Sequence, residues 1–335
     1  MADADLATKA PENDAQEDVP LDQEAEQISG IQGDTKPDQG AASMGEHCVT
    51  DRPTPVGETP TGEVTKYDDI EVYVTKPADY PHQPSKLLLL LTGGTGIHST
   101  NNQLQADKYA AEGFLVVMPD QFAGDPAPTT TTTELAEENP SIIEQVKIGV
   151  ASVVKSFTID MWLARHTAEK VLPVLKKVIT SVKEEFADAV ANGGGIYAVG
   201  YCFGAKYILL LGSELDQDTL EGQKSPQAQA EEGMVKSGPL IKAGAIAHGT
   251  QVSKEDVANT SVPMCIVAVK DDPLFPDEVR EEGTKALEAK KLEHEVKVYP
   301  GVPHGFAVFG DYQDSKIVDA QKEAFQQMLA WLKSH

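Results

Sequence analysis

Short apolar runs, most of them closed by a turn rich in glycine, proline or aspartate, recur along most of the chain. The runs that predict strands are Leu87–Leu91, Phe114–Met118, Ile196–Val199, Ala243–Ala247, Val262–Val269 and His294–Tyr299. Continuous apolar runs of this length are typical of strands that are buried on both faces of a parallel sheet. An earlier run, Ile70–Val74, alternates apolar with polar or aromatic residues and predicts an edge strand in an antiparallel start to the sheet.

Helical patterns separate these strands. They cover Asn101–Glu112, parts of 140–192, Ala205–Leu211, Pro276–Leu292 and a final amphipathic helix whose apolar face includes Ile317, Phe325 and Trp331. Residues 213–237 are polar without a clear period, which predicts a surface excursion. Strands that alternate with helices predict an α/β fold, with a mostly parallel central sheet flanked by helices.

The start of the sequence differs in composition. Residues 1–45 are rich in Asp, Glu, Gln, Ala and Pro and carry no Phe, Tyr or Trp and, apart from Val19, no Val. Such a segment cannot bury enough apolar surface to offset the entropy of ordering it, so we expect a disordered acidic tail. The folded domain is predicted to span 60–335.

The overall charge excludes several classes of partner. The 335 residues include 53 acidic and 28 basic side chains, a net charge of −25, so binding to nucleic acid or to an anionic membrane surface is not expected. No apolar run is long enough to cross a bilayer, and no segment at the start resembles a signal peptide. The three cysteines, Cys48, Cys202 and Cys265, form no C-x-x-C pair, so neither a disulfide framework nor a metal site is predicted. We expect a cytoplasmic protein without a cofactor.

The pentapeptide Gly200-Tyr201-Cys202-Phe203-Gly204 carries the clearest chemical signal. It lies where a predicted strand gives way to a predicted helix, and its G-x-C-x-G pattern is that of a nucleophile elbow with sulfur in place of the usual hydroxyl. Glycine is needed there because the chains on either side of the turn pass too close for side chains. At a helix N-terminus the free N–H groups favour a thiolate, so Cys202 is the candidate nucleophile.

A nucleophile of this kind needs a base and an acid that orients the base, and in this architecture they follow later in the chain. Asp271 and Asp272 come directly after the strand ending at Val269, and His304 follows the strand ending at Tyr299. Carboxyl ends of parallel strands gather active-site loops, so the placement favours His304 as the base. Asp272 is preferred as the acid because Pro273 restricts its backbone, with Asp271 as the alternative. His248, at another strand end, either lines the same pocket or is structural.

At this point the chain resembles the dienelactone hydrolases over most of residues 60–335. The likeness lies in Asn101-Asn102-Gln103-Leu104 with Ala106-Asp107, Val117-Met118-Pro119-Asp120 with Gly124-Asp125-Pro126, the cysteine elbow, Asp272-Pro273-Leu274-Phe275, and Tyr299-Pro300-Gly301 with His304-Gly305-Phe306. The resemblance implies a single α/β-hydrolase domain with Cys202 as nucleophile, Asp272 as acid and His304 as base. It also implies an oxyanion hole formed by the N–H groups of Phe203 and of the turn near Gly94.

Two departures from the family pattern bear on the substrate. Members that open dienelactone carry an acidic residue where this chain aligns Gly93, and an arginine shortly after the histidine, where this chain has Val308 and Phe309. Their absence favours a less anionic substrate, or one recognised through Arg165 instead.

The sulfur nucleophile sets a further expectation. A thiolate leaves a tetrahedral intermediate more readily than an alkoxide does, so the intermediate goes forward chiefly when the substrate has a stabilised leaving group. We therefore expect hydrolysis of small activated esters or lactones through a thioester acyl-enzyme, slow turnover of alkyl esters and no turnover of peptides.

Two alternatives come from other classes of protein. One is a weakly active or inactive hydrolase fold that serves as an interaction protein, which the glycine at position 93 favours. The other is an NAD(P)-dependent short-chain dehydrogenase, suggested by the Gly-rich turn at 92–96 and by Tyr312 and Lys316 in a Tyr-x-x-x-Lys pattern. The dehydrogenase fingerprint is incomplete, because its third glycine is replaced by His98 or Ser99.

Overall fold

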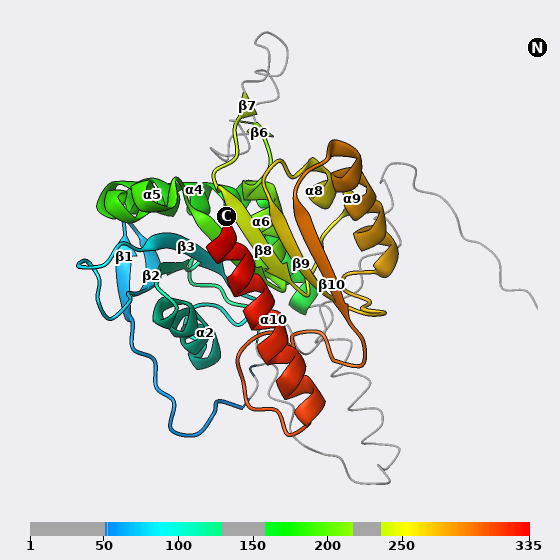
Figure 1. Cartoon of the computed structure of the whole chain (residues 1–335), viewed down its shortest axis with the longest axis horizontal. Coiled ribbons are helices and arrows are strands. Elements are labelled where there is room, and N and C mark those ends of the chain that lie inside the picture. The colour runs from blue at the N-terminus through cyan, green and yellow to red at the C-terminus, as the bar shows by residue number, and fades with distance from the viewer. Residues whose placement is uncertain (1–50, 52, 129–157, 217–235) are drawn as a thin grey trace, which may run out of the picture. The chain divides into compact units, whose positions relative to one another are not determined.

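A computed structural model describes residues 51, 53–128, 158–216 and 236–335. The central feature of the described residues is an eight-stranded sheet (Figure 1). Its strands, in spatial order, are β1 (Glu63–Tyr67), β2 (Ile70–Thr75), β4 (Phe114–Pro119), β3 (Lys86–Leu91), β5 (Tyr197–Tyr201), β8 (Ala243–Ala247), β9 (Met264–Val269) and β10 (His294–Tyr299). The strands from β4 to β10 are parallel to one another, as the apolar runs predicted.

The antiparallel start of the sheet was predicted, but its edge was not. Strand β2 pairs on one side with β1 and on the other with β4, both antiparallel, so Ile70–Val74 is an inner strand and the prediction of an edge strand was wrong. The edge is β1, which the hydrophobic pattern missed because Glu63–Tyr67 is polar and exposed along almost its whole length. A strand with little buried surface leaves almost no apolar period to detect.

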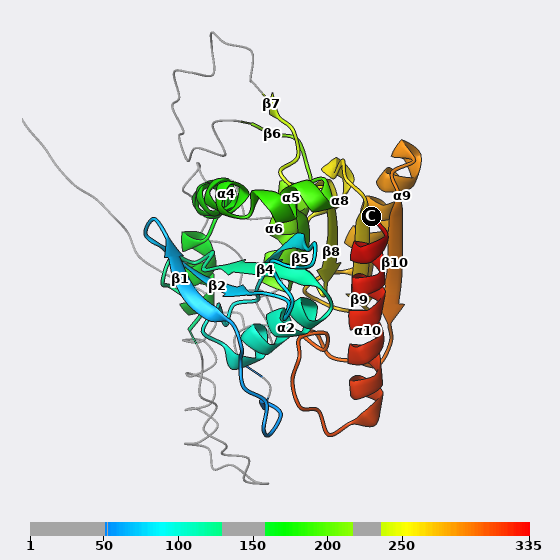
Figure 2. The ribbon, with the colours of Figure 1, turned by 60° about the vertical axis from the view of Figure 1, so that its left-hand side comes forward.

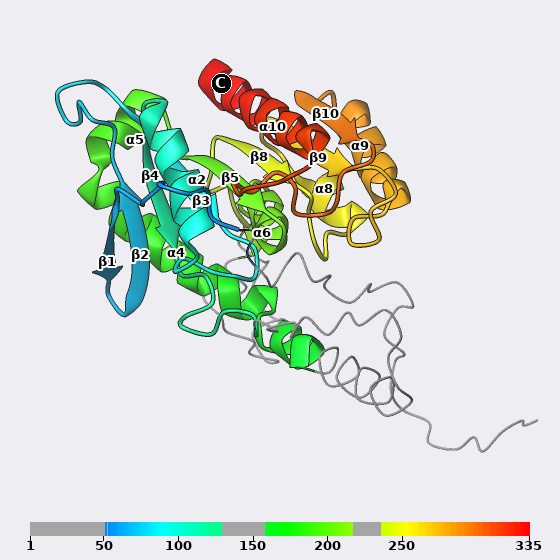
Figure 3. The same ribbon diagram turned by 90° about the horizontal axis from the view of Figure 1, so that it is seen from below.

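Helices cover both faces of the sheet (Figures 2 and 3). One face packs against α2 (Thr100–Ala111) and α10 (Ser315–Ser334). The other packs against α4 (Ala168–Glu185), α5 (Ala187–Gly193), α6 (Phe203–Leu211), α8 (Lys254–Asn259) and α9 (Asp277–Lys290). Each face has its own apolar cluster, so the sheet is buried on both sides. This burial explains why the central strands are apolar without interruption.

The remaining predictions fall partly outside the described residues. The proposed tail at 1–45 lies outside them, as do residues 129–157 and 217–235 of the predicted helical and surface segments. Short strands β6 (Leu215–Asp216) and β7 (Lys236–Ser237) form a small antiparallel pair at the base of the second gap. In the parts of the chain that can be described, no helix is long and apolar enough to span a membrane.

The sheet brings the candidate residues to one edge. The turn 92–96 follows β3, Cys202 follows β5, His248 follows β8, and Asp272 and His304 follow β9 and β10. Because these five strands are parallel, their carboxyl ends lie side by side.

Candidate active site

Cys202 occupies the tight turn between β5 and α6. Its backbone has φ 52° and ψ −114°, a strained conformation for a residue with a side chain. The turn is held from both sides, since the N–H of Cys202 donates to the Ala247 carbonyl at 3.1 Å and the N–H of Ala205 donates to the Cys202 carbonyl. The thiol is buried, with 2% of the residue exposed. This is the local geometry that the G-x-C-x-G pattern predicted.

The two glycines of the pattern are required by close backbone contacts. A Cβ on Gly200 would stand 2.7 Å from the carbonyl oxygen of Gly204 and 2.6 Å from Ile208. A Cβ on Gly204 would stand 2.4 Å from the carbonyl oxygen of Leu91 in β3. Neither glycine has a positive φ, so each is required for space and not for backbone freedom. Strand β3 can therefore approach the start of α6 closely, which brings the turn after β3 against the elbow.

His304 and Asp272 meet across two loops. The Nδ1 of His304 and the Oδ2 of Asp272 are 2.7 Å apart, and both side chains are almost fully buried. The other carboxylate oxygen of Asp272 accepts the Leu274 N–H at 2.9 Å, which fixes the orientation of the carboxylate. Asp271 is exposed and has φ 58°. Of the two aspartates considered from the sequence, the structure places Asp272 against the imidazole.

The sulfur of Cys202 lies on the opposite side of the same imidazole. A side-chain hydrogen bond joins His304 and Cys202. The hydroxyl of Thr250, three residues after β8, contacts both groups: its Oγ1 is 3.2 Å from the Sγ of Cys202 and 3.2 Å from the Nε2 of His304. The structure thus brings Cys202, His304 and Asp272 together, with Thr250 beside them.

These neighbours change the protonation of the imidazole. Burial alone would lower the pKa of His304, because it disfavours the charged ring. The hydrogen bonds to Asp272 and Cys202 and the charges of both groups outweigh burial and raise the pKa of His304 from 6.5 to about 9. The shift favours the protonated ring, with Asp272 beside Nδ1 and the hydroxyl of Thr250 beside Nε2.

The loop that carries His304 is anchored by residues from both covering helices of its face. Gln321 of α10 donates to the carbonyls of Phe306 and Val308, and Gln105 of α2 accepts the N–H of Phe309. The ring of His248, which is fully buried, packs edge-on against His304 with ring centroids 5.0 Å apart. These contacts leave the imidazole little freedom to turn away from the sulfur.

The two groups predicted for the oxyanion belong to the elbow itself and to the turn after β3. Phe203 is the first residue of α6, and the N–H groups of a first helical turn have no acceptor within their own helix. The turn that contains Gly94 is joined to the elbow by the N–H of Gly204, which donates to the Thr92 carbonyl at 3.0 Å. The carbonyl of Gly94 accepts from Ala127, which fixes this turn against the loop after β4.

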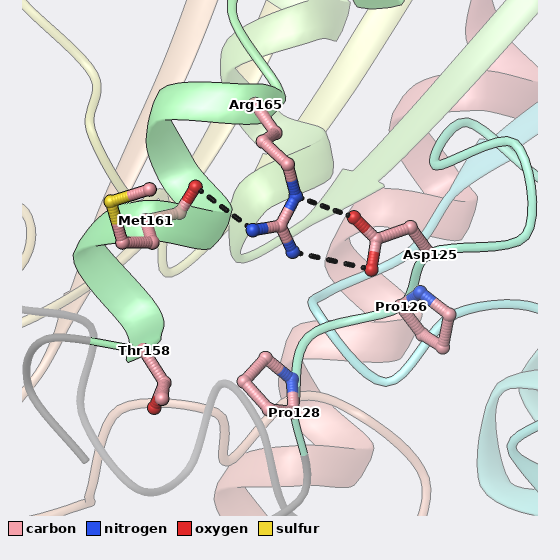
Figure 4. Close-up of a pocket in the computed structure, with 6 residues that line it drawn as sticks. All are labelled: Asp125, Pro126, Pro128, Thr158, Met161 and Arg165. Carbon is pink, nitrogen blue, oxygen red and sulfur yellow. Dashed lines mark hydrogen bonds and ion pairs between the residues drawn. The ribbon is translucent and has the colours of Figure 1, made fainter. Parts of the chain in front are cut away.

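Arg165 lies in a separate pocket of about 250 Å³ (Figure 4). Its lining consists of Asp125, Pro126, Pro128, Thr158, Met161 and Arg165. The guanidinium forms two hydrogen bonds with the carboxylate of Asp125, at 2.9 and 3.3 Å, and a third with the Met161 carbonyl. Cys202 and His304 are not among the residues that line this pocket.

Two further observations bear on cofactors. The hydroxyl of Tyr312 donates to the carbonyl of Gly305 in the loop of His304, so it belongs to the support of that loop. Within the described ranges, no cluster of three or more His, Cys, Asp or Glu side chains could hold a metal ion.

Thr250 was missed in the sequence. It follows a strand end, as Cys202, Asp272 and His304 do, but threonine at such a place belongs to no catalytic pattern. The only available signal was its position two residues after His248 at the carboxyl edge of the sheet.

Comparison with known proteins assigns the chain to a family. The model of the dienelactone hydrolase family matches residues 70–222 and 232–335. The chain is 29% identical over 281 residues to hydrolase pyvD of Aspergillus violaceofuscus, covering 83% of this chain and 92% of that protein. It is 24% identical to dienlactone hydrolase 1 of Gibberella moniliformis, covering 82% of this chain and 87% of that protein.

The fold has a solved counterpart. A Klebsiella pneumoniae protein assigned to the dienelactone hydrolases superposes with a TM-score of 0.56 at 18% sequence identity, and the match covers 83% of this chain and all of that one. This likeness confirms the α/β-hydrolase fold. The family model's match over most of the described residues establishes that the chain belongs to the dienelactone hydrolase family, a family of hydrolases that act on esters or lactones.

Proposed function

We propose that this protein hydrolyses small activated carboxylic esters or lactones, with Cys202 as nucleophile, His304 as base and acid, and Asp272 as the group that orients His304. The observation that carries the proposal is the continuous set of contacts from Asp272 through His304 to Cys202, with Cys202 held in a strained elbow at φ 52°. Strain of this kind persists only where the surrounding structure enforces it, and it is common at active sites.

In the proposed first half-reaction, the thiolate of Cys202 attacks the carbonyl carbon of the ester. The carbonyl π electrons move to oxygen, and the resulting oxyanion accepts hydrogen bonds from the N–H groups of Phe203 and Gly94. When the carbonyl reforms, the bond to the leaving oxygen breaks, and the proton on Nε2 of His304 can pass to that oxygen. The products are a thioester on Cys202 and an alcohol, or an open-chain hydroxy acyl group when the substrate is a lactone.

In the second half-reaction, the now neutral His304 takes a proton from water at Nε2. The hydroxide formed attacks the thioester carbon, and collapse of the second intermediate releases the acid and returns the thiolate. Asp272 accepts from Nδ1–H throughout, so the tautomer that leaves Nε2 ready to accept a proton is maintained. Donors aimed at the oxyanion typically contribute a few kcal/mol to acyl transfer.

Two features define the proposed substrate class. The thiolate is a good leaving group, so a substrate must carry a leaving oxygen that departs at least as easily, as in aryl esters and enol lactones. Position 93 is a glycine, and the loop after His304 offers Val308 and Phe309 where an arginine could have held a carboxylate. Both features favour substrates that are activated and not strongly anionic.

The test is an activity panel with the full chain against paired aryl and ethyl esters, an enol lactone, a thioester and a peptide. We expect hydrolysis of the activated substrates, and loss of at least about a thousandfold in kcat for Cys202→Ala and His304→Ala, since each removes a group that acts only in the chemical steps. Thermal unfolding of each variant provides the control for folding. Residual activity of Cys202→Ala close to that of the wild type would overturn the proposal.

A second candidate is a hydrolase fold that serves as an interaction protein, and the glycine at position 93 favours it. A dienelactone hydrolase that had lost catalysis would show no turnover on any substrate of the panel, even if Cys202 still reacted with an electrophile. Turnover by the wild type together with its loss in Cys202→Ala decides against this candidate.

A further inference from the structure

The hydroxyl of Thr250 contacts both the sulfur of Cys202 and the imidazole of His304. We propose that Thr250 is a positioning residue of this reaction: its hydroxyl holds the thiolate of Cys202 and the imidazolium of His304 in one hydrogen-bonded array and can pass the proton between them. This proposal rests on the proposed function, because it assigns Thr250 to the same site. It is carried by the two distances from Oγ1, each 3.2 Å, to Sγ and to Nε2.

The backbone fixes the hydroxyl relative to the sulfur. The N–H of Thr250 donates to the carbonyl of Cys202 at 3.1 Å, so the two residues share a hydrogen bond between their main chains as well as one between their side chains. Thr250 is 1% exposed, and a branched Cβ restricts its χ1 angle. The hydroxyl is therefore held in place before any substrate binds.

Counting donors and acceptors shows what the hydroxyl can do. A threonine hydroxyl has one proton to donate and two lone pairs that accept. The Nδ1 of His304 is already engaged by Asp272. In the ion pair, Nε2–H is shared between Oγ1 and the sulfur, and the hydroxyl proton is donated to the thiolate, so every group in the array has a partner.

The neutral pair is satisfied by the reverse arrangement. The S–H of Cys202 donates to Oγ1, and the hydroxyl proton is donated to the bare Nε2. Moving from one arrangement to the other transfers the thiol proton to Oγ1 and the hydroxyl proton to Nε2. One proton then passes from sulfur to nitrogen, the hydroxyl is regenerated, and no oxidant, reductant or further reactant is required.

The titratable groups around Cys202 and His304 show why the hydroxyl of Thr250 matters for the thiol. The titratable groups at this array are His304 after β10 and its neighbours Asp272 after β9 and His248 after β8, and the ring of Tyr201 of β5 lies against His248. The cation of Lys206 in α6 is engaged by the Gln251 carbonyl and by Asp256. No carboxylate comes from position 93, which is a glycine. In this chain the group beside the sulfur is the neutral hydroxyl of Thr250, 3.2 Å away.

The experiment measures the thiol directly and needs no substrate. The full-length wild type, Thr250→Val and Thr250→Ser are treated with iodoacetamide from pH 5 to 9, and alkylation of Cys202 is followed by mass spectrometry of its peptide. Valine has the shape of threonine without the hydroxyl, and serine restores the hydroxyl. Removing a hydrogen bond to a charged partner should slow alkylation near neutral pH about tenfold in Thr250→Val and shift its pH midpoint upward, with Thr250→Ser within about threefold of the wild type.

The results separate this proposal from its alternatives. A merely structural role predicts that Thr250→Val lowers the melting temperature while the pH midpoint of alkylation stays where it is in the wild type, and that outcome overturns the proposal. If Thr250→Val does not fold, Thr250→Ser and Thr250→Ala are compared, and equal midpoints in these two variants overturn it as well. Failure of the proposed function has a different signature, because ester hydrolysis would then survive in Cys202→Ala whatever the alkylation data show.

Discussion

Cys202 and Cys265 are both buried cysteines in the same sheet, yet their surroundings are opposite. Strand β8 separates them: Val199 in β5 is level with Ala245 in β8, which is level with Cys265 in β9. Cys265 lies within its strand in the apolar cluster beneath α2 and α10, where burial, followed by the charge of Glu295, raises the pKa of its thiol. Cys202 lies beyond the end of its strand, in a strained turn beside an imidazole and a hydroxyl.

The difference shows that burial alone does not decide what a thiol does. In the middle of β9 the neighbours offer nothing to a thiolate, so the sulfur acts as a small apolar group. At the elbow the backbone adopts an unfavourable conformation, and three loops place polar groups around the sulfur. The following experiments test this contrast, in order of decreasing effect.

The contrast should be greatest in reactivity. We expect an electrophile such as iodoacetamide at pH 7.5 to label Cys202 at least about a thousandfold faster than Cys265, since each unit by which a thiol pKa exceeds the ambient pH lowers the thiolate fraction about tenfold. Peptide mapping after labelling of the native protein measures both sites in one sample. Labelling of Cys265 at a comparable rate in folded protein would contradict the distinction.

A second experiment attacks the backbone that creates the elbow. Gly204→Ala would place a methyl group 2.4 Å from the Leu91 carbonyl oxygen, so β3 and α6 would have to separate. We expect a loss of about 3 kcal/mol in the free energy of unfolding, the range for overpacking a close contact, together with reduced activity. Chemical denaturation gives the free energy.

The matched control is Gly238→Ala. Gly238 is exposed and has an ordinary φ, and apart from its chain neighbours no atom of the described residues lies within 4 Å of its added Cβ. This variant should stay within about 0.5 kcal/mol of the wild type. A similar loss in both variants would show that the close approach at the elbow is not what requires Gly204.

The third experiment uses pH to separate the steps in which His304 acts. The pKa of His304 is raised to about 9, so the ring is protonated below that pH and loses its proton as pH rises through it. An ethyl ester needs that proton for its leaving alkoxide, whereas an aryl ester does not. Between pH 8 and 10 the ratio of the ethyl to the aryl rate of acylation should fall about tenfold, as protonated His304 is lost by one decade per pH unit above its pKa.

Stopped-flow release of the alcohol or phenol measures acylation before the thioester is hydrolysed. A ratio that is constant over this range would contradict the assignment of His304 as the proton donor. The same measurement on Thr250→Ser serves as a control, because that variant retains the hydroxyl and should give the wild-type pattern.

The smallest effect is expected at Arg165. Its guanidinium is half-exposed and already paired with Asp125, so a substrate carboxylate would share a charge that is largely neutralised. Arg165→Gln should lower kcat/KM for a carboxylate-bearing ester by about threefold relative to its neutral methyl ester, since exposed ion pairs contribute little. Kinetics on this matched pair of substrates measure the effect, and a loss of a hundredfold would identify Arg165 as the principal anion clamp.

Much of the fold could be predicted because its signals are local. Strands β8 and β10 coincide with the predicted Ala243–Ala247 and His294–Tyr299, since each apolar run or alternation ends at a turn. The wrong placement of β2 at the edge has the opposite cause. Its neighbour β1 is recognised only by pairing across the turn at 68–69, and pairing between strands leaves no period in a polar segment such as Glu63–Tyr67.

In the candidate site, the sequence predicted the residues whose position follows from the order of the strands along the chain. Cys202, Asp272 and His304 each follow a strand, and the parallel sheet gathers those ends. The choice between Asp271 and Asp272 depends on which way a single turn faces, and Thr250 depends on the register between β5 and β8. The spacing of residues along the chain reveals neither the direction of that turn nor the register of those strands. Choosing Asp272 and finding Thr250 therefore required the structure.

The main-chain hydrogen bonds around the elbow have a consequence for how the protein loses activity on heating. The N–H groups of Cys202, His248 and Thr250 each donate to a carbonyl on an adjacent segment, at Ala247, Val267 and Cys202 respectively, so the ladder between the central strands continues through the site. Amides of this kind exchange with solvent only when the central sheet opens. We therefore expect the elbow to unfold together with the domain, so that inactivation on warming coincides with cooperative unfolding.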